Sequence, residues 1–205
     1  MIIYMFKIIC ITDRKLCKED FLIRIEKIAS AKPDRIMFRD KDCNDDDYVK
    51  TAFRILEISD RCGVPCSMYR HFDIFDNIHF TMPVLRECSN EIKNGLNITG
   101  VSIHSVDEAV EAEKMGVDYV IAGHIFETGC KPDLTPRGLG FLHEICESVK
   151  IPVYAIGGIN PENIRHIVQA GADGACIMSG FMTCENPVEY IKKLRKGAEI
   201  DEIQT

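Results

Sequence analysis

A histidine stands at the end of one of the apolar runs of this chain, where it could transfer a proton. His124 follows the run 119–123, which has no polar side chain after Tyr119. Imidazole titrates near neutral pH, so it can take a proton at one point of a ligand and return it at another. A histidine in this place could instead hydrogen-bond a carbonyl of the following loop. The residues alone leave both roles open.

Two glycine-containing turns are suited to bind an oxyanion. Gly157 and Gly158 end the run in AIGGINP, and Ser179 and Gly180 end the run in IMSG. Glycine lets backbone N–H groups approach a phosphate, and a following helix N-terminus adds favourable partial charge. A Gly-Gly pair by itself indicates only a tight turn. Two such turns after successive apolar runs favour a phosphate site.

A pair of cations follows another apolar run. Arg39 and Lys41 are separated by one residue, so the alternation of a strand would point both side chains the same way. Together they could bind a carboxylate or a phosphate. The alternative is an ordinary charged strand end that pairs with Asp40 or Asp42.

A long loop begins at His124 and runs to about residue 138, with glycine and proline in it. Loops of this length over a binding face suit a lid or a ligand-binding segment. It contributes Thr128 and Lys131 as candidate substrate-binding residues, and Ser102 in GVSIH is a third candidate. By contrast, the acidic run DCNDDD at 42–47 lacks the glycine and distal glutamate of a calcium loop, so it indicates a solvated helix N-terminus.

Short apolar runs and helical stretches alternate along the chain, and together they must position these residues. Most runs are continuously apolar, as expected for parallel strands covered on both faces. Ser105 and Glu108 have the spacing of a capping box at the start of a helix. The expected strands are 7–13, 35–39, 65–69, 77–80, 99–104, 119–123, 152–158 and 174–180.

A recurring turn supports one repeated unit. Gly116-Val117-Asp118 and the sequence GAD at 171–173 each end a helical stretch and begin an apolar run, as Pro33-Asp34 does. This repeat predicts a single (β/α)₈ TIM barrel over 1–205, with a loose tail at about 197–205 and an unusually short crossover near 70–80. A doubly wound open sheet is the alternative. In such a barrel the site lies at the carboxyl ends of the strands.

Composition narrows the class of protein. The 205 residues are 46% hydrophobic and carry a formal net charge of -7, which argues against a nucleic-acid or anionic-membrane surface.

The ten cysteines show no C-x-x-C pair, so reduced thiols in a cytoplasmic protein are expected. The opening MIIYMFKIICI lacks the features of a signal peptide and is interpreted as a first strand. The chain could form a homo-oligomer.

Four ordered motifs resemble the thiamine phosphate synthase superfamily, and within it the TenI-like thiazole tautomerases. They are GVSIHS, AEKMGVDYVIAGHIFET, IPVYAIGGINPENI and AGADGACIMSG. The resemblance extends from the strand 7–13 to Tyr190. Synthases carry a Q-x-R-x-K pattern, whose glutamine is Met37 here, and magnesium-binding aspartates where this chain has Tyr69-Arg70 and the stretch 81–84. Gly-His also replaces the Gly-Pro of synthases after the sixth strand.

These departures favour the tautomerase. The resemblance then implies that a non-aromatic carboxythiazole phosphate becomes its aromatic isomer, with His124 moving the proton and with no metal or cofactor. Gly158, Ser179 and Gly180 would hold the phosphate of this small-molecule substrate, and Arg39 and Lys41 would help to hold its carboxylate. Two alternatives stay open: a thiamine phosphate synthase that joins hydroxymethylpyrimidine pyrophosphate to thiazole phosphate, and a non-catalytic binder of thiazole or thiamine phosphates.

Overall fold

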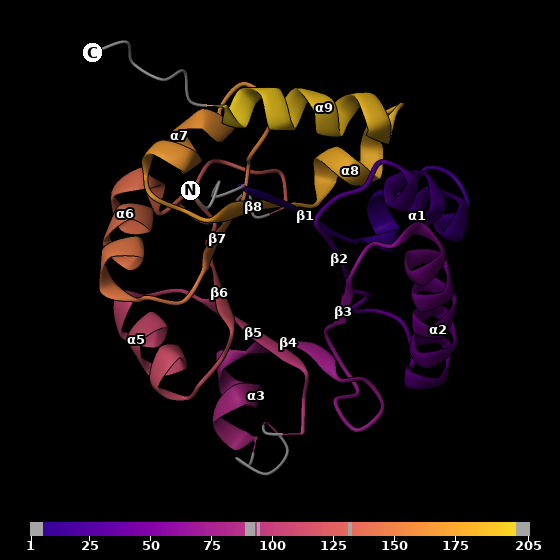
Figure 1. The fold of residues 1–205 in the computed structure, drawn as a ribbon, viewed down its shortest axis with the longest axis horizontal. Helices are drawn as coiled ribbons and strands as arrows, with labels where there is room; N and C mark the ends of the chain where they lie inside the picture. The colour runs from indigo at the N-terminus through magenta and orange to yellow at the C-terminus, as the bar shows by residue number, and fades with distance from the viewer. Residues whose placement is uncertain (1–5, 89–92, 94, 131–132, 200–205) are drawn as a thin grey trace.

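The computed structural model describes residues 6–88, 93, 95–130 and 133–199. Eight parallel strands pair in sequence order, and β1 (Lys7–Ile11) also pairs with β8 (Gly174–Ile177), so the sheet closes. Figure 1 shows the strands as an inner ring surrounded by helices. The predicted (β/α)₈ barrel is confirmed, and the open-sheet alternative is wrong.

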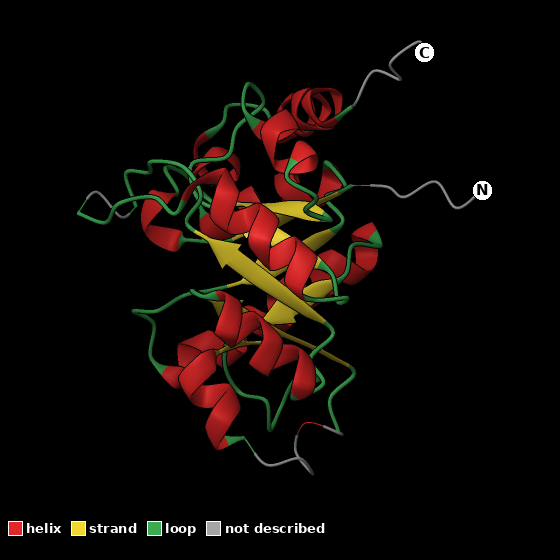
Figure 2. Ribbon diagram, turned by 90° about the vertical axis from the view of Figure 1, so that its left-hand side faces the viewer, coloured by secondary structure: helices red, strands yellow, loops and turns green. Residues whose placement is uncertain are grey.

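Each expected strand is present, and several end one to three residues early because polar residues and glycines leave the ladder. The remaining strands are β2 (Arg35–Phe38), β3 (Cys66–Met68), β4 (Asn77–Thr81), β5 (Ile98–Ile103), β6 (Tyr119–Gly123) and β7 (Val153–Ile156). Figure 2 shows the helices covering the outside of these strands. Those helices are α1 (Phe21–Ser30), α2 (Asp45–Cys62), α3 (Met82–Glu87), α5 (Val106–Lys114), α6 (Gly138–Ser148), α7 (Ile164–Gln169), α8 (Ser179–Thr183) and α9 (Pro187–Ala198).

Local capping explains where two of the helices begin. The Ser105 hydroxyl accepts the Glu108 N–H at 3.1 Å at the start of α5, as the capping-box spacing predicts. The acidic run is the exposed first turn of α2, with Asn44 as its N-cap, which confirms the predicted helix N-terminus. Acidic residues in that turn interact favourably with the helix dipole.

The aspartates of the repeated helix-to-strand turn hydrogen-bond the preceding strand. Asp34 accepts the Ile8 N–H at 2.9 Å, before β2. Asp118 accepts the Thr99 N–H at 2.7 Å, before β6, and Asp173 accepts the N–H of the first residue of β7 at 2.6 Å, before β8. Each carboxylate therefore satisfies a backbone donor at the amino-terminal end of a neighbouring strand. This shared bond accounts for the sequence repeat.

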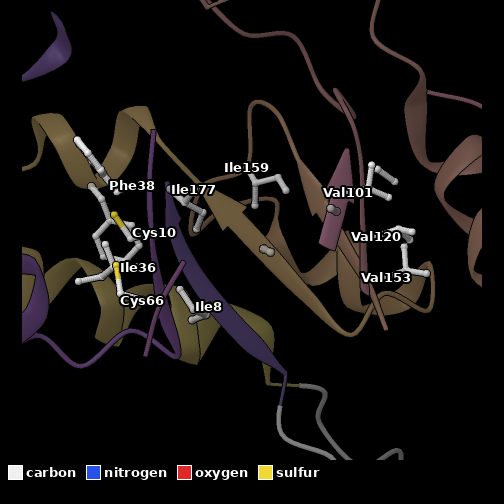
Figure 3. Close-up of a cluster of buried hydrophobic side chains, with 14 of the residues drawn as sticks. Ile8, Cys10, Ile36, Phe38, Cys66, Val101, Val120, Val153, Ile159 and Ile177 are labelled. Carbon is white, nitrogen blue, oxygen red and sulfur yellow. The ribbon is translucent and has the colours of Figure 1, made fainter. Parts of the chain in front are cut away.

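The alternation of each strand divides the buried side chains into two cores. Ile8 and Cys10 face the helices, whereas Ile9 and Ile11 face the barrel interior. Figure 3 shows part of the outer core, where β1–β3 residues such as Ile8 and Cys10 gather on one side and the β5–β7 valines on the other. The smaller inner core is Ile9, Ile11, Met37, Tyr119, Ile121 and Cys176.

The connections between the elements confirm one predicted feature and correct another. The β3–β4 connection, residues 69–76, contains a turn and no helix, which confirms its unusual shortness. Helix α9 continues to Ala198, so 197–198 are not a loose tail, because Gly197 packs closely on Pro161; residues 200–205 lie outside the described part. Helix α7 starts at Ile164, because residues 161–163 form a turn capped by Asn160. Over the described ranges, no helix has the length and apolarity needed to cross a membrane.

Thiol reactivity should follow burial. Burial raises the pKa of Cys10 well above its ordinary value and that of Cys66 to about 12, whereas Cys130 is exposed in the loop after β6. Because the thiolate is the reactive form, we expect iodoacetamide at neutral pH to modify Cys130 first in the folded protein. Peptide mass spectrometry with and without urea checks this order. Modification of Cys10 at the rate of Cys130 without urea would contradict it.

Candidate functional site

The carboxyl ends of all the strands lie at one rim of the barrel because the strands are parallel. Sites of this fold occupy that rim. The closed topology therefore brings together candidates from strands far apart in the sequence. Those at the strand ends or in the loops that follow are Arg39, Lys41, Ser102, His124, Thr128, Gly158, Ser179 and Gly180. Lys131 lies outside the described residues.

Arg39 follows β2 on the inner side of the barrel. Tyr69 packs against the inner core that contains Met37, and the charge of Arg39 acts on the Tyr69 hydroxyl, which indicates that Arg39 lies on this side. The Thr12 hydroxyl accepts the Arg39 N–H at 2.9 Å and holds its backbone in place. Burial raises the pKa of Tyr69 and the nearby charge of Arg39 opposes that rise. Among the described residues, the Arg39 guanidinium has no ion-pair partner, so it can bind an anion.

The acidic residues beside Arg39 pair with other cations. Asp40 is buried and bonds Arg14 at 2.7 Å, and Asp42 pairs with Lys15 at 2.8 Å. In the structure, therefore, neither aspartate forms an ion pair with Arg39. The η1 turn, Arg14–Leu16, supplies the two cations that form these ion pairs, and Arg39 forms none with either aspartate.

Arg70 holds the loop between β2 and α2. Its Nη2 donates to the carbonyl oxygens of Asp40 at 2.7 Å and Cys43 at 2.8 Å, and its guanidinium stacks on the Tyr48 ring at 4.4 Å. Lys41 lies exposed in this loop, beyond the end of β2, so strand alternation does not align it with the inward cation. Arg70 thus fixes the loop and does not face the interior.

Gly157 and Gly158 form a backbone turn after β7 that no other residue type fits well. Their φ angles are 107° and 67°, in the region that favours glycine. A Cβ on Gly158 would overlap the Glu127 carbonyl oxygen and lie 2.8 Å from the Phe126 Cβ. The Gly158 N–H has no acceptor in the described part of the chain. It is therefore available to an anion at the rim.

Ser179 and Gly180 open the short helix α8 after β8. Ser179 is exposed, and Gly180 lies against the Tyr190 hydroxyl, where a Cβ would overlap the oxygen. The glycine is thus required by packing, a reason that the sequence did not show. Ser179 and Gly180 remain candidates for contact with a phosphate because they follow the strand next to β7.

His124 anchors the long loop after β6. Its imidazole is 6% exposed, and its Nε2 lies 3.1 Å from the Leu134 carbonyl oxygen; its own carbonyl accepts the Arg137 N–H at 3.0 Å. The structure thus has the loop-carbonyl contact that the sequence left open. Thr128 lines a cavity of about 640 Å³ in the same loop, together with residues 127–129 and 133–136.

Loss of this anchor should loosen the loop. We expect His124→Ala to lower the free energy of unfolding by about 0.5–1.5 kcal/mol, because the hydrogen bond between the imidazole and the Leu134 carbonyl is lost. Amide exchange at Arg137 should quicken, since its N–H bonds the His124 carbonyl. Hydrogen-exchange mass spectrometry checks this, with His166→Ala, an exposed histidine on α7, as the control. Unchanged protection of the loop in His124→Ala would contradict the anchoring role.

Ser102 belongs to a buried polar cluster that sequence reasoning missed. His79 Nε2 lies 2.8 Å from the Ser102 hydroxyl, and His79 Nδ1 lies 3.2 Å from the Tyr119 hydroxyl. The Tyr69 ring lies 4.7 Å from the His79 ring. His79 lies on β4 and points into the barrel beside Ser102. Matching the two-residue alternation of β4 to that of β5 would have indicated this.

Magnesium, which the synthase resemblance implies, does not fit the side chains at this rim. Hard divalent cations prefer several oxygen ligands, above all carboxylates. No group of three or more His, Cys, Asp or Glu side chains that could hold a metal gathers within the described residues. At the two expected ligand positions, Arg70 is bonded to loop carbonyls and residues 81–84 carry no carboxylate. The rim instead offers a cation and backbone N–H groups.

Comparisons with known proteins agree on one family. A family model described as thiamine monophosphate synthase matches residues 8–181. A thiamine-phosphate synthase of Clostridium acetobutylicum is 33% identical over 88% of this chain and 89% of its own length. A second, from Pyrococcus furiosus, is 46% identical over 58% of this chain and 56% of its own length. A solved thiamine phosphate pyrophosphorylase of Pyrococcus furiosus superposes with a TM-score of 0.81 at 31% identity, covering 94% of this chain and 95% of its own.

These matches overturn the expectation of a thiazole tautomerase, which is wrong. The relatives are named synthases and support the alternative function. The tautomerase expectation depended on Gly123-His124 and the residues 126–128. In the structure the Nε2 atom of His124 contacts the Leu134 carbonyl oxygen. A histidine at the end of the right strand was therefore insufficient to assign the chemistry.

The predicted superfamily is confirmed at the level of sequence and of structure. The family model spans most of the barrel, from β1 into α8, and the solved relative has the same architecture. The four motifs that carried the resemblance lie within or beside β5–β8, where the candidate Ser102, Gly158 and Ser179 are positioned. The chain belongs to the thiamine monophosphate synthase family, a family of thiamine biosynthesis.

Proposed function

We propose that the chain is a transferase that joins a pyrimidine carrying a pyrophosphate to a thiazole phosphate, with thiamine phosphate and pyrophosphate as products. The observation that carries this proposal is the presence of two separate anion-binding features at one rim. Arg39 follows β2 and Gly158 follows β7. They are three strand spacings apart around the barrel, about 14 Å along the sheet. Two anionic groups could therefore bind at once.

Each feature suits one of the two substrates. The guanidinium of Arg39 is a planar donor that matches pyrophosphate oxygens. The Gly158 N–H, with Ser179 and Gly180 after the neighbouring strand, suits the phosphate monoester of the thiazole. In the reaction, the bond between the pyrimidine methylene carbon and the pyrophosphate oxygen breaks and its electron pair leaves with the oxygen. The thiazole nitrogen then bonds that carbon.

The residues of this chain assist by position and by charge. Arg39 would stabilise negative charge as it develops on the leaving pyrophosphate, a form of electrostatic catalysis. The glycine turn would hold the thiazole so that its nitrogen faces the reacting carbon. The family relationship supports the overall reaction, since the Clostridium acetobutylicum relative is named a thiamine-phosphate synthase. Thr12 and Arg70 keep the β2 end and its loop in place around Arg39.

Formation of thiamine phosphate tests the proposal. Purified protein would be given hydroxymethylpyrimidine pyrophosphate and thiazole phosphate, once with Mg²⁺ and once with EDTA, and the product separated by chromatography. Thiamine phosphate in either arm supports the transferase, provided that each single-substrate control is blank. Absence of product in both arms, with both substrates still intact, overturns it and leaves binding without catalysis.

A further inference from the structure

The buried cluster beneath the rim has a defined set of donors and acceptors. Tyr119 is 3% exposed and His79 is fully buried, so neither can use bulk water to satisfy its polar atoms. Ser102 is half-buried and lies at the carboxyl half of β5, where it reaches the rim. The cluster therefore connects the barrel interior to the region where a ligand would bind.

The Tyr119 hydroxyl has one acceptor within the described residues, His79 Nδ1 at 3.2 Å. Burial raises the pKa of Tyr119 well above its ordinary value, so this hydroxyl keeps its proton. A buried hydroxyl proton with no acceptor costs about 1–3 kcal/mol. Tyr119 consequently donates to Nδ1.

His79 is a neutral imidazole in this setting. Burial lowers its pKa to about 3, so a single ring nitrogen carries hydrogen. Since Nδ1 accepts from Tyr119, the hydrogen is on Nε2, which donates to the Ser102 hydroxyl oxygen at 2.8 Å. Two aromatic rings confine the imidazole: Tyr69 at 4.7 Å and Tyr119 at 5.6 Å.

We propose that Tyr119, His79 and Ser102 form a hydrogen-bond chain whose donors point from the barrel interior to the rim, so that Ser102 donates its hydrogen to an acceptor atom of the bound ligand. The opposite direction would leave the buried Tyr119 proton without an acceptor. The outward direction leaves only the proton of the half-buried Ser102 free, and a ligand or water can accept it. This inference rests on the proposed function in one respect, namely that a ligand binds at the rim.

The ligand atom that accepts from Ser102 belongs to the pyrimidine pyrophosphate substrate. It is either a nitrogen of the pyrimidine ring or an oxygen of the pyrophosphate. Tyr119 and His79 are positioning residues in this account, because they act through Ser102. Because the Ser102 hydroxyl accepts from His79 and donates toward the rim, it selects ligands that present a lone pair to it. It disfavours ligands that present an N–H there.

The tautomer of His79 in the ligand-free protein tests the direction of the chain. Long-range ¹H–¹⁵N spectra distinguish Nε2–H from Nδ1–H, and His79→Gln identifies the signal among the six histidines. We expect the Nε2–H tautomer. The Nδ1–H tautomer in the unmodified protein overturns the proposal. No turnover is needed, so this outcome is independent of whether the chain makes thiamine phosphate.

Binding measurements test the consequence for the ligand. Calorimetry with hydroxymethylpyrimidine and, separately, with inorganic pyrophosphate shows which part meets Ser102. Ser102→Ala should weaken one of them about two- to tenfold, the value of one hydrogen bond. Tyr119→Phe should weaken the binding of the same probe. Without the Tyr119 hydroxyl nothing fixes the tautomer of His79, so the Ser102 hydroxyl can donate to Nε2 instead of to the ligand.

Tyr154→Phe is the matched control. Its ring also faces the interior, 5.3 Å from that of Tyr119, but its hydroxyl has no hydrogen bond to His79. We expect this variant to keep the Nε2–H tautomer and the affinity for both probes. Unchanged affinity for both probes in Ser102→Ala would overturn the donor role of the serine.

Discussion

Gly158→Ala should weaken the binding of thiazole phosphate roughly 10- to 150-fold, the value of one hydrogen bond to a charged group. The turn after β7 has no room for a side chain, because a Cβ would overlap the Glu127 carbonyl and press on Phe126. The backbone must move to relieve this overlap. The N–H that faces the rim then leaves its position.

A second glycine separates this effect from simple backbone strain. Gly63, which ends α2, has a φ of 63°, close to the 67° of Gly158, but a Cβ added to Gly63 would meet nothing within 4 Å. An alanine in the left-handed region costs about 1–2 kcal/mol. Gly63→Ala should therefore lose stability alone, whereas Gly158→Ala should lose stability and affinity.

Urea unfolding and calorimetry of thiazole phosphate binding measure the two quantities. If Gly158→Ala binds as tightly as Gly63→Ala, the turn after β7 does not hold the phosphate. The proposed phosphate site would then have to move to Ser179 and Gly180, next to it on β8.

Arg39→Gln should weaken pyrophosphate binding by a similar factor, roughly 10- to 150-fold, because a charge-assisted contact contributes about 1.5–3 kcal/mol. Among the described residues, its guanidinium forms no ion pair within 4 Å, and Asp42 is the nearby carboxylate on which its charge acts. Its neighbours Asp40 and Asp42 pair with Arg14 and Lys15. The loss should fall on affinity more than on folding.

Arg54→Gln is the control for the loss of one positive charge. Arg54 lies exposed on α2 and pairs with Glu57, away from the rim. Calorimetry with inorganic pyrophosphate at two salt concentrations would show a reduced salt dependence in Arg39→Gln only. Equal affinities of the two variants would contradict a role for Arg39 in binding the leaving group.

Much of the fold was predictable from local patterns. Continuous apolar runs predicted parallel strands, and the Asp34, Asp118 and Asp173 turns predicted their repeated order, because each aspartate bonds the strand before it. The capping-box residue Ser105 and the acidic run 42–47 marked helix starts correctly. These features depend on contacts between sequence neighbours or successive elements.

The composition of the site was predictable only in part. Gly158 became a candidate because glycine lets a backbone N–H approach an anion, and Arg39 because it follows an apolar run; both stay predictions. Lys41 was misaligned because β2 stops at Phe38, before the alternation reaches it. His124 was assigned to proton transfer because the sequence does not show that a carbonyl ten residues later meets its imidazole.

Periodicity, turn chemistry and ordered motifs are local properties, and they were enough to predict the barrel, the rim that carries the candidate site and the superfamily. Tertiary contacts were needed to establish which cation stays unpaired and how His79 connects Tyr119 to Ser102. Those outcomes depend on side chains from different strands, 23 and 40 residues from His79 along the chain. Partners that distant are set by the pairing of β4 with β5 and of β5 with β6, because this pairing aligns the inward-facing side chains of the three strands.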